Sequence, residues 1–182
     1  DIVHRDLKLE NFVLARTGPL EGNTLKLIDF GLARDCVEGK VLRSRVGTAA
    51  YMSPQVAYRK YDRRCDIWSV GVMLYLMLSG RLPVYGNSDS EILRRIKEGR
   101  WDFTASIWAP VSCEAKSLVR ALMRRKADDR ISATAALSHP WLLEQADSDE
   151  SSTCCARPRA ASEASTTTPK STMRTLPSAK PQ

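Results

Sequence analysis

The chain has 182 residues, of which 43% are hydrophobic and 27% are charged. A chain of this length can bury one compact core, so we expect a single folded domain with at most an appendage. The formal net charge of +7 comes from Lys and Arg residues that are interleaved with carboxylates and form no basic block, which disfavours nucleic acid as a partner and favours a small anionic ligand.

Two short extended segments are expected near the start of the chain, at residues 11–15 and 25–28. The loop between them, "TGPLEGNT", is rich in the Gly, Pro and Asn residues that connect hairpin strands. Residues 31–61 follow without a clear period, and helical patterns begin after them. The sequence therefore predicts an α+β domain that is predominantly α-helical and is entered through one small hairpin.

Four helices are expected in the second half of the chain. The first, over residues 66–79, is apolar on every face and belongs inside a core, with Asp66 as its N-cap and Gly80 at its end. The second, over residues 88–98, opens with the capping box "SDSE" and is amphipathic. The third lies in "SCEAKSLVRALMRRK", and the fourth, in "SATAALSHPWLLEQ", is broken or ended near Pro140.

The composition changes near Asp147, where large apolar residues almost disappear and Ser, Thr, Ala and Pro dominate. Such a segment cannot offset its ordering entropy by burial, so residues 145–182 are predicted to be a disordered tail. Five scattered cysteines with no CxxC pair favour a reducing cytoplasmic setting, with the nucleus as an alternative. The longest apolar run, over residues 67–78, is too short for a bilayer span of about 20 residues, so no membrane partner is expected.

The residues with the clearest chemistry lie in "DIVHRDLKLEN" and "KLIDFGLA", which bring together Asp6, Lys8, Asn11 and Asp29. Phosphoryl transfer needs oxygen ligands for magnesium, a fixed positive charge and a carboxylate that orients the attacking hydroxyl. Magnesium asks for only one or two carboxylates and keeps several waters. This set of side chains therefore predicts phosphoryl transfer, while a polar loop with a salt bridge is the non-functional alternative.

The segment "HRDLKLEN" resembles the catalytic loop of eukaryotic protein kinases, and "DFG" resembles their metal-binding motif. Later segments agree in order: "GTAAYMSPQ" resembles the end of the activation segment, "YDRRCDIWSVGVMLYLMLSGRLPV" the buried helix that anchors the catalytic loop, and "DDRISATAALSHPW" the closing segment. Lys two residues after Asp is typical of serine/threonine kinases. The last two segments are most like the calcium-dependent and calmodulin-dependent kinase group, and the resemblance covers roughly residues 1–143.

This resemblance implies a protein kinase-like fold and assigns residues 1–144 to its C-terminal lobe. The sequence contains no Gly-rich phosphate loop, no strand lysine of the VAIK type and no helix glutamate to pair with it, and we expect those parts to precede Asp1. The parent enzyme would use ATP and Mg²⁺ to phosphorylate Ser or Thr in protein substrates. The fragment alone is expected to be inactive.

The resemblance also implies roles for individual residues. Asp6 would orient the substrate hydroxyl as the catalytic base, and Lys8 would contact the γ-phosphate of ATP. Asn11 and Asp29 would hold magnesium and, with Lys8, form the nucleotide-binding set. Glu10 resembles a carboxylate that binds a basic residue upstream of the target hydroxyl, which implies a preference for substrates with basic residues.

In the activation segment, Thr48 would lie beside Asp6 and Lys8, in the pocket that favours Ser or Thr. Arg5 would face this segment, where a phosphate could pair with it. Ser44 is our candidate for phosphorylation. Calcium-dependent kinases often carry an acidic residue at this place, so we hypothesise that the modification restores a missing negative charge.

The remaining motif positions are expected to be structural: His4, Phe30, Gly31, Gln55, Asp66 and Arg130. His4 would support Phe30 and would not act as a base. Gln55 stands where the family motif ends in Glu, so the expected ion pair with Arg130 becomes a neutral hydrogen bond. We expect this exchange to cost less than the roughly 3 to 5 kcal/mol lost when a buried charge is left alone.

Two other functions compete with phosphoryl transfer. A catalytically inactive kinase-like lobe could act as a protein-binding scaffold, using the groove beside Glu10 and the helix over residues 88–98. The presence of the whole set Asp6, Lys8, Asn11 and Asp29 disfavours a scaffold, which has no physical need for it. A pseudo-enzyme that binds nucleotide without transfer depends on the strand lysine and stays open.

Overall fold

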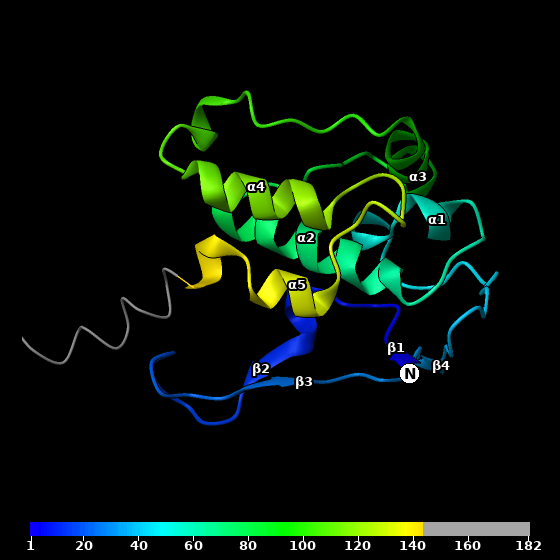
Figure 1. Ribbon diagram of the computed structural model, residues 1–182, viewed down its shortest axis with the longest axis horizontal. Helices are drawn as coiled ribbons and strands as arrows, with labels where there is room; N and C mark the ends of the chain where they lie inside the picture. Colours follow the sequence, from blue (N-terminus) through cyan, green and yellow to red (C-terminus); the bar gives the residue numbers. More distant parts are fainter. Residues whose placement is uncertain (144–182) are drawn as a thin grey trace, which may run out of the picture.

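A computed structural model describes residues 1–143 of the chain. Residues 144–182, on which the predicted disordered tail falls, lie outside the described part. A helical body stands over two small sheets (Figure 1). This arrangement agrees with the predicted α+β, helix-rich class. The elements are β1 (Ile2–Val3), η1 (Leu9–Asn11), β2 (Phe12–Leu14), β3 (Leu25–Leu27), β4 (Arg34–Asp35), η2 (Ala49–Tyr51), α1 (Pro54–Ala57), α2 (Arg64–Ser79), α3 (Asp89–Glu98), η3 (Ser106–Trp108), α4 (Cys113–Leu122) and α5 (Ala133–Leu137).

The core is built around α2, which lies beside α4 in the middle of the helical body (Figure 1). Trp68 and Val72 of α2 and Val119 of α4 are almost completely buried. The two helices approach closely because α2 has a glycine at the crossing: a Cβ on Gly71 would lie 2.6 Å from Cγ of Met123. The prediction that the first long helix belongs inside a core is confirmed.

The helix ends show where the sequence patterns were right and where they were wrong. Ser88 caps α3 by accepting a hydrogen bond from the backbone of Glu91, and Gly80 ends α2 in the left-handed conformation. The fourth helix ends at Leu137, before Pro140. Asp66, however, is not the N-cap of α2: the helix begins two residues earlier, and the Asp66 carboxylate is used elsewhere.

The predicted hairpin is present as the antiparallel pair of β2 and β3, in the register Phe12↔Leu27. A second pair, β1 with β4, was not predicted. Each of its strands has two residues, which is too short for an alternating pattern. Between β4 and η2 the chain forms no helix or strand, and it is fixed there by the isolated bridge Leu42↔Tyr61.

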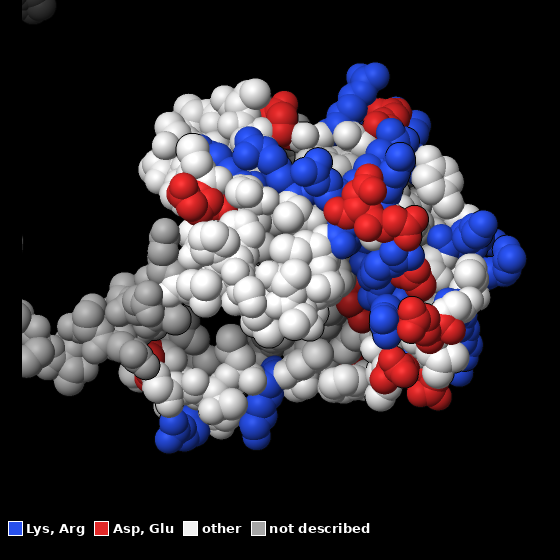
Figure 2. Space-filling model, viewed as in Figure 1, with Lys and Arg blue, Asp and Glu red and all other residues white. Residues whose placement is uncertain are grey.

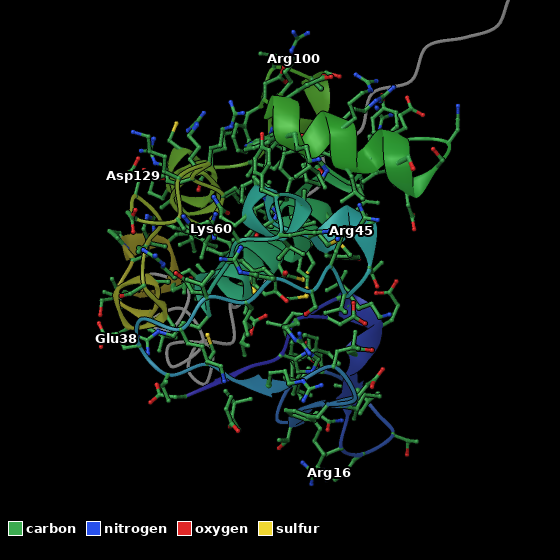
Figure 3. The ribbon with its side chains drawn as sticks, turned by 90° about the vertical axis from the view of Figure 1, so that its right-hand side faces the viewer. Arg16, Glu38, Arg45, Lys60, Arg100 and Asp129 are labelled. Atoms are coloured by element: carbon green, nitrogen blue, oxygen red, sulfur yellow. The ribbon has the colours of Figure 1, made fainter. Side chains whose placement is uncertain are left out.

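Lys and Arg are mixed with Asp and Glu over much of the surface, but a row of basic side chains crosses the face above α4 and continues toward α3 (Figure 2). In the view turned by 90°, Arg100, which follows α3, lies at the top of the molecule, and Arg16, in the loop between β2 and β3, lies at the bottom (Figure 3). Within residues 1–143, no helix combines the length and apolar character needed to cross a membrane.

Candidate active site

Asp66 fixes the loop that carries the predicted catalytic residues. Its carboxylate accepts the backbone N–H of His4 at 2.6 Å and that of Arg5 at 2.9 Å. Burial raises the pKa of Asp66, although these two N–H groups oppose the shift. Arg5 has φ of 72°, a costly conformation for a non-glycine residue. The Asp66 carboxylate therefore helps to hold a strained loop in place.

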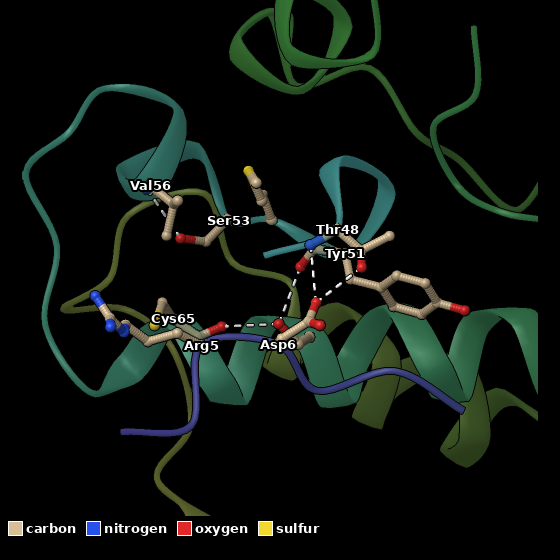
Figure 4. A pocket seen from close by; sticks show the side chains of 9 residues that line it. Arg5, Asp6, Thr48, Tyr51, Ser53, Val56 and Cys65 are labelled. Atoms are coloured by element: carbon tan, nitrogen blue, oxygen red, sulfur yellow. Dashed lines mark hydrogen bonds between the residues drawn. The ribbon is translucent and has the colours of Figure 1, made fainter. Parts of the chain in front are cut away.

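Asp6 is held by Thr48, which was predicted to lie beside it (Figure 4). Its Oδ1 accepts the backbone N–H and the hydroxyl of Thr48, both at 2.8 Å. Lys8 Nζ lies 3.3 Å from Oδ2 of Asp6 and 3.2 Å from Thr48 Oγ1. Burial alone would raise the pKa of Asp6, but the Thr48 hydrogen bonds and the Lys8 ammonium outweigh it and keep the pKa low. Asp6 is thus ionised at neutral pH.

The cavity behind Asp6 has room for no more than a water molecule. It is lined by side chains of the activation segment and of α2, among them Ser53, Cys65 and Ser69 (Figure 4). A substrate must therefore meet Asp6 from the open side of the catalytic loop.

The β2–β3 hairpin brings the two predicted magnesium ligands to one edge. The backbone carbonyl of Asn11 accepts the N–H of Ile28 at 2.9 Å, so Asn11 lies opposite the residue that precedes Asp29. Asn11 donates its Nδ2 to the Asp6 carbonyl at 2.9 Å, which leaves its Oδ1 as a ligand. Oδ1 of Asp29 accepts the N–H of Gly31 at 3.2 Å, which leaves Oδ2.

These two oxygens fit the donor types that magnesium accepts from proteins, one carboxylate and one carbonyl, with water and phosphate filling the other positions. The described residues contain no group of three or more His, Cys, Asp or Glu side chains that could hold a metal. A metal at the hairpin edge would therefore depend on phosphate oxygens for part of its coordination.

Arg5 joins the catalytic loop to the activation segment. Its guanidinium donates to the carbonyl of Leu32 at 2.6 Å, to the hydroxyl of Ser44 at 2.8 Å and to the hydroxyl of Tyr61 at 3.3 Å. The two hydroxyls lie 3.3 Å apart. Ser44 is exposed. The side chain that sequence analysis selected for phosphorylation therefore lies directly on the guanidinium selected as its partner.

Comparison with known proteins identifies the family. The family model described as "Protein kinase domain" matches residues 1–142. The chain belongs to the protein kinase domain family. Among curated proteins it is 44% identical to "Calcium-dependent protein kinase 29" of Arabidopsis thaliana over 82% of this chain and 28% of that protein. It is 41% identical to "Calcium-dependent protein kinase 26" of Oryza sativa subsp. japonica over 82% of this chain and 27% of that protein.

The predicted similarity to calcium-dependent kinases is thus confirmed, and the chain spans a little over a quarter of the length of these relatives. The roles of individual residues in this kinase domain stay predictions. Glu10, the predicted contact for a basic substrate residue, is exposed at the start of the hairpin, so a substrate can reach it.

The buried His4 of the kinase domain packs edge-on against Phe30, with ring centroids 5.0 Å apart, as predicted. Its Nδ1 accepts the backbone N–H of Asp6 at 3.3 Å. His4 thus helps to orient the loop from beneath. Phe30 itself is 57% exposed.

The hydrogen bond predicted between Gln55 and Arg130 is present, with Nη2 donating to Oε1 at 2.9 Å. The buried guanidinium also donates to the carbonyls of Arg64 and Arg124 and lies over the Trp68 ring, 5.3 Å from its centroid. Burial lowers the pKa of Arg130 to about 10. Backbone carbonyls and a neutral amide therefore take the place of the carboxylate at this position.

Sequence reasoning missed three features of the kinase site. The helix expected to anchor the catalytic loop does so through Asp66, whose individual contacts span more than 60 residues and were not predicted. The hydroxyl of Tyr61, at the start of the same motif segment, reaches Arg5. Gly47 has φ of 100°, and a Cβ there would lie 2.3 Å from the Arg5 carbonyl oxygen. A glycine one residue before Thr48 was a signal of this close approach.

Proposed function

We propose that residues 1–144 form the C-terminal lobe of a serine/threonine protein kinase whose parent protein transfers the γ-phosphate of ATP to Ser or Thr. The observation that carries the proposal is the geometry at Asp6. Its carboxylate is ionised, Thr48 holds one oxygen, and the other faces Lys8. Family membership and a sequence without a Gly-rich loop support the assignment to this lobe.

In the proposed reaction, the substrate hydroxyl donates a hydrogen bond to Oδ2 of Asp6, which orients the hydroxyl oxygen toward the γ-phosphorus. The new O–P bond forms as the bond to the β-phosphate oxygen breaks, the hydroxyl proton passes to Asp6, and ADP leaves. Lys8, which the salt bridge keeps beside Asp6, neutralises charge on the transferred phosphoryl group.

Asn11 and Asp29 would hold Mg²⁺ through the oxygens that their own hydrogen bonds leave available. When bound, the ion supplies neutralisation of the phosphate charge. The two residues lie on a hairpin whose register is fixed by backbone hydrogen bonds, so their separation is set before the nucleotide arrives. Such preorganisation lowers the cost of binding.

The finer proposals concern substrate and regulation. The exposed Glu10 carboxylate would attract a basic residue upstream of the target hydroxyl. A phosphate on Ser44 would lie on the Arg5 guanidinium, which already donates to the unmodified hydroxyl at 2.8 Å. Charge-assisted hydrogen bonds are shorter and roughly twice as strong as neutral ones. Phosphorylation would therefore strengthen the link between activation segment and catalytic loop.

The decisive experiment is a graft. Residues 1–143 replace the aligned segment of the Arabidopsis calcium-dependent protein kinase 29, and transfer from ATP to a Ser-containing basic peptide is measured. The graft is expected to be active, and Asp6→Asn to reduce its rate by about 100-fold or more. The matched Asp35→Asn change, at an exposed carboxylate of β4, is expected to leave the rate unchanged. A folded graft that binds ATP and transfers nothing would favour the scaffold alternative.

The isolated 182-residue chain gives a second test. With ATP, magnesium and the same peptide it is expected to show negligible turnover, because its sequence carries no Gly-rich loop or strand lysine to hold the nucleotide. Robust turnover would contradict the lobe assignment.

The Ser44 proposal is tested in the active graft. Ser44→Ala is expected to lower the rate and to remove its sensitivity to phosphatase, whereas Ser106→Ala, at another exposed serine, is expected to change neither. Equal phosphatase sensitivity in the graft and in its Ser44→Ala variant would end the proposal.

A further inference from the structure

A groove is lined by the segment that follows α3 and by the C-terminal end of α4. Both segments lie on the side of α2 away from β1 and the catalytic loop (Figure 1). Its volume is about 510 Å³, which is within the range of ligand-binding clefts in proteins. The row of basic side chains above α4 borders it (Figure 2). The lining residues are Trp101, Asp102, Phe103, Thr104, Arg120, Met123, Arg124 and Arg125.

The three arginines of the groove carry charge that the described residues leave uncompensated. No salt bridge found within residues 1–143 involves Arg120, Arg124 or Arg125. Arg120 lies over the face of Phe103, with its guanidinium carbon 4.5 Å from the ring centroid. Arg125 donates to the backbone carbonyl of Lys97 at 2.5 Å. Two of the three guanidiniums are therefore positioned in advance.

The backbone on the α4 side of the groove is held from beneath. The carbonyl of Arg124 accepts two hydrogen bonds from Arg130, at 3.2 and 3.0 Å. The carbonyl of Arg125 accepts Nε2 of Gln55 at 2.7 Å. These contacts use the backbone and leave both arginine side chains exposed to solvent.

The facing wall is fixed in a similar way. Tyr75 donates its hydroxyl to the carbonyl of Asp102 at 3.0 Å. The Phe103 ring packs against buried Trp108, with centroids 4.6 Å apart. A groove whose walls are already ordered loses little entropy when a ligand binds.

We infer that this groove binds an acidic segment of a partner protein, with its carboxylates on Arg120 and Arg124 and an apolar side chain over the half-buried Trp101. The charge and the mixed lining support a peptide. A nucleic-acid backbone fits less well, because the groove is short and mixes apolar side chains with its arginines. The inference does not depend on the proposed phosphoryl transfer, since Asp6 lies on the other side of α2.

The test measures binding of a fluorescein-labelled peptide, Asp-Glu-Asp-Phe-Asp-Glu, to the full chain by fluorescence anisotropy. Saturable binding is expected that weakens as salt is raised. The double change Arg120→Gln with Arg124→Gln is expected to weaken it by about tenfold or more. The matched double change Arg16→Gln with Lys26→Gln removes the same charge from the hairpin, far from the groove (Figure 3), and is expected to leave affinity unchanged. Circular dichroism checks that all variants fold.

Four results would overturn the inference. Equal weakening by the hairpin control would mean attraction by net charge alone, and equal binding of the Asn/Gln version of the peptide would mean that carboxylates do not matter. Tighter binding of a single-stranded oligonucleotide of equal charge, lost with the two groove arginines, would make the ligand nucleic acid. A tenfold gain in peptide affinity on neutralising Asp147, Asp149 and Glu150 would make the chain's own acidic segment the occupant.

Discussion

The helical body and the catalytic face of this kinase domain are stabilised by different means. The body around α2 and α4 buries large apolar side chains, with Trp68 and Trp108 each 1% exposed. On the catalytic face, Ile28 and Phe30 are 41% and 57% exposed, and order comes from hydrogen bonds to charged groups. Strain is concentrated there too, since Arg5 and Asp29 both have positive φ. The catalytic face therefore depends on a few polar contacts, each of which a single substitution can remove.

The largest effect is expected in the helical body, from Trp108→Ala. Trp108 packs edge-on against Tyr75 and Phe103, each with a centroid distance of 4.6 Å, so its loss leaves a large cavity. The free energy of unfolding should fall by about 4 kcal/mol, measured by urea denaturation. Tyr85→Ala, at a tyrosine that is 69% exposed, should change it by less than about 0.5 kcal/mol. Equal losses in the two variants would contradict burial as the source of stability.

A smaller but more local effect is expected from Asp66→Ala. The change leaves the N–H groups of His4 and Arg5 without their acceptor, and each unsatisfied group costs about 1 to 3 kcal/mol. Part of this cost is recovered because a buried carboxylate is removed, so we expect a net loss of about 2 kcal/mol. Hydrogen exchange should accelerate at the amides of His4 and Arg5 before it does in α2. Equal acceleration of hydrogen exchange in the catalytic loop and in α2 would contradict a local role for Asp66.

Gln55→Glu is expected to stabilise the domain by less than about 1 kcal/mol at neutral pH. It gives buried Arg130 an ionic partner, but it also removes the hydrogen bond that Nε2 of Gln55 donates to the carbonyl of Arg125. The new carboxylate should have a depressed pKa in the folded state. Its contribution is then present above the pKa of an unfolded Glu and is lost as pH falls through the folded value. Chemical denaturation at pH 7 and pH 3 checks this, with Gln55→Leu as the destabilised counterpart. An unchanged or lower stability at pH 7 would show that the backbone carbonyls already satisfy the guanidinium.

The smallest effect is expected from the pH dependence of Asp6. Its pKa is lowered in the folded state, so its contribution to stability is present above the ordinary pKa of an unfolded aspartate and is lost as pH falls through the lower folded pKa. Asp6→Asn should therefore flatten the acid side of the stability profile, measured by denaturation between pH 7 and pH 2. Asp35→Asn is the control, and an identical acid slope in both variants would contradict the assignment of the shift to the Thr48 and Lys8 contacts.

The elements that the sequence predicted well have strong local signals. The hairpin has turn residues between two apolar segments, and α3 has Ser88 at its start. The start of α2 was misplaced because Asp66 has the residue type of an N-cap, yet its carboxylate bonds the catalytic loop. The β1–β4 pair has two residues in each strand, which are too few to show a periodic pattern in the sequence.

In the site, motif resemblance predicted that Thr48 would lie beside Asp6 and that Arg5 would face the activation segment, and both contacts are present. The Tyr61 hydroxyl beside Ser44 could not be predicted, because the two residues are 17 apart with no pattern linking them. Long-range contacts made by single polar atoms leave no trace in local composition.

Arg130 joins three stretches of chain that are distant in sequence, through Gln55, the carbonyl of Arg64 and the carbonyl of Arg124. The first ends the activation segment, the second begins the helix that anchors the catalytic loop, and the third borders the distal groove. A disruptive substitution of this one guanidinium would impair the proposed phosphoryl transfer and the proposed peptide binding together, so experiments that aim to separate them must leave it intact.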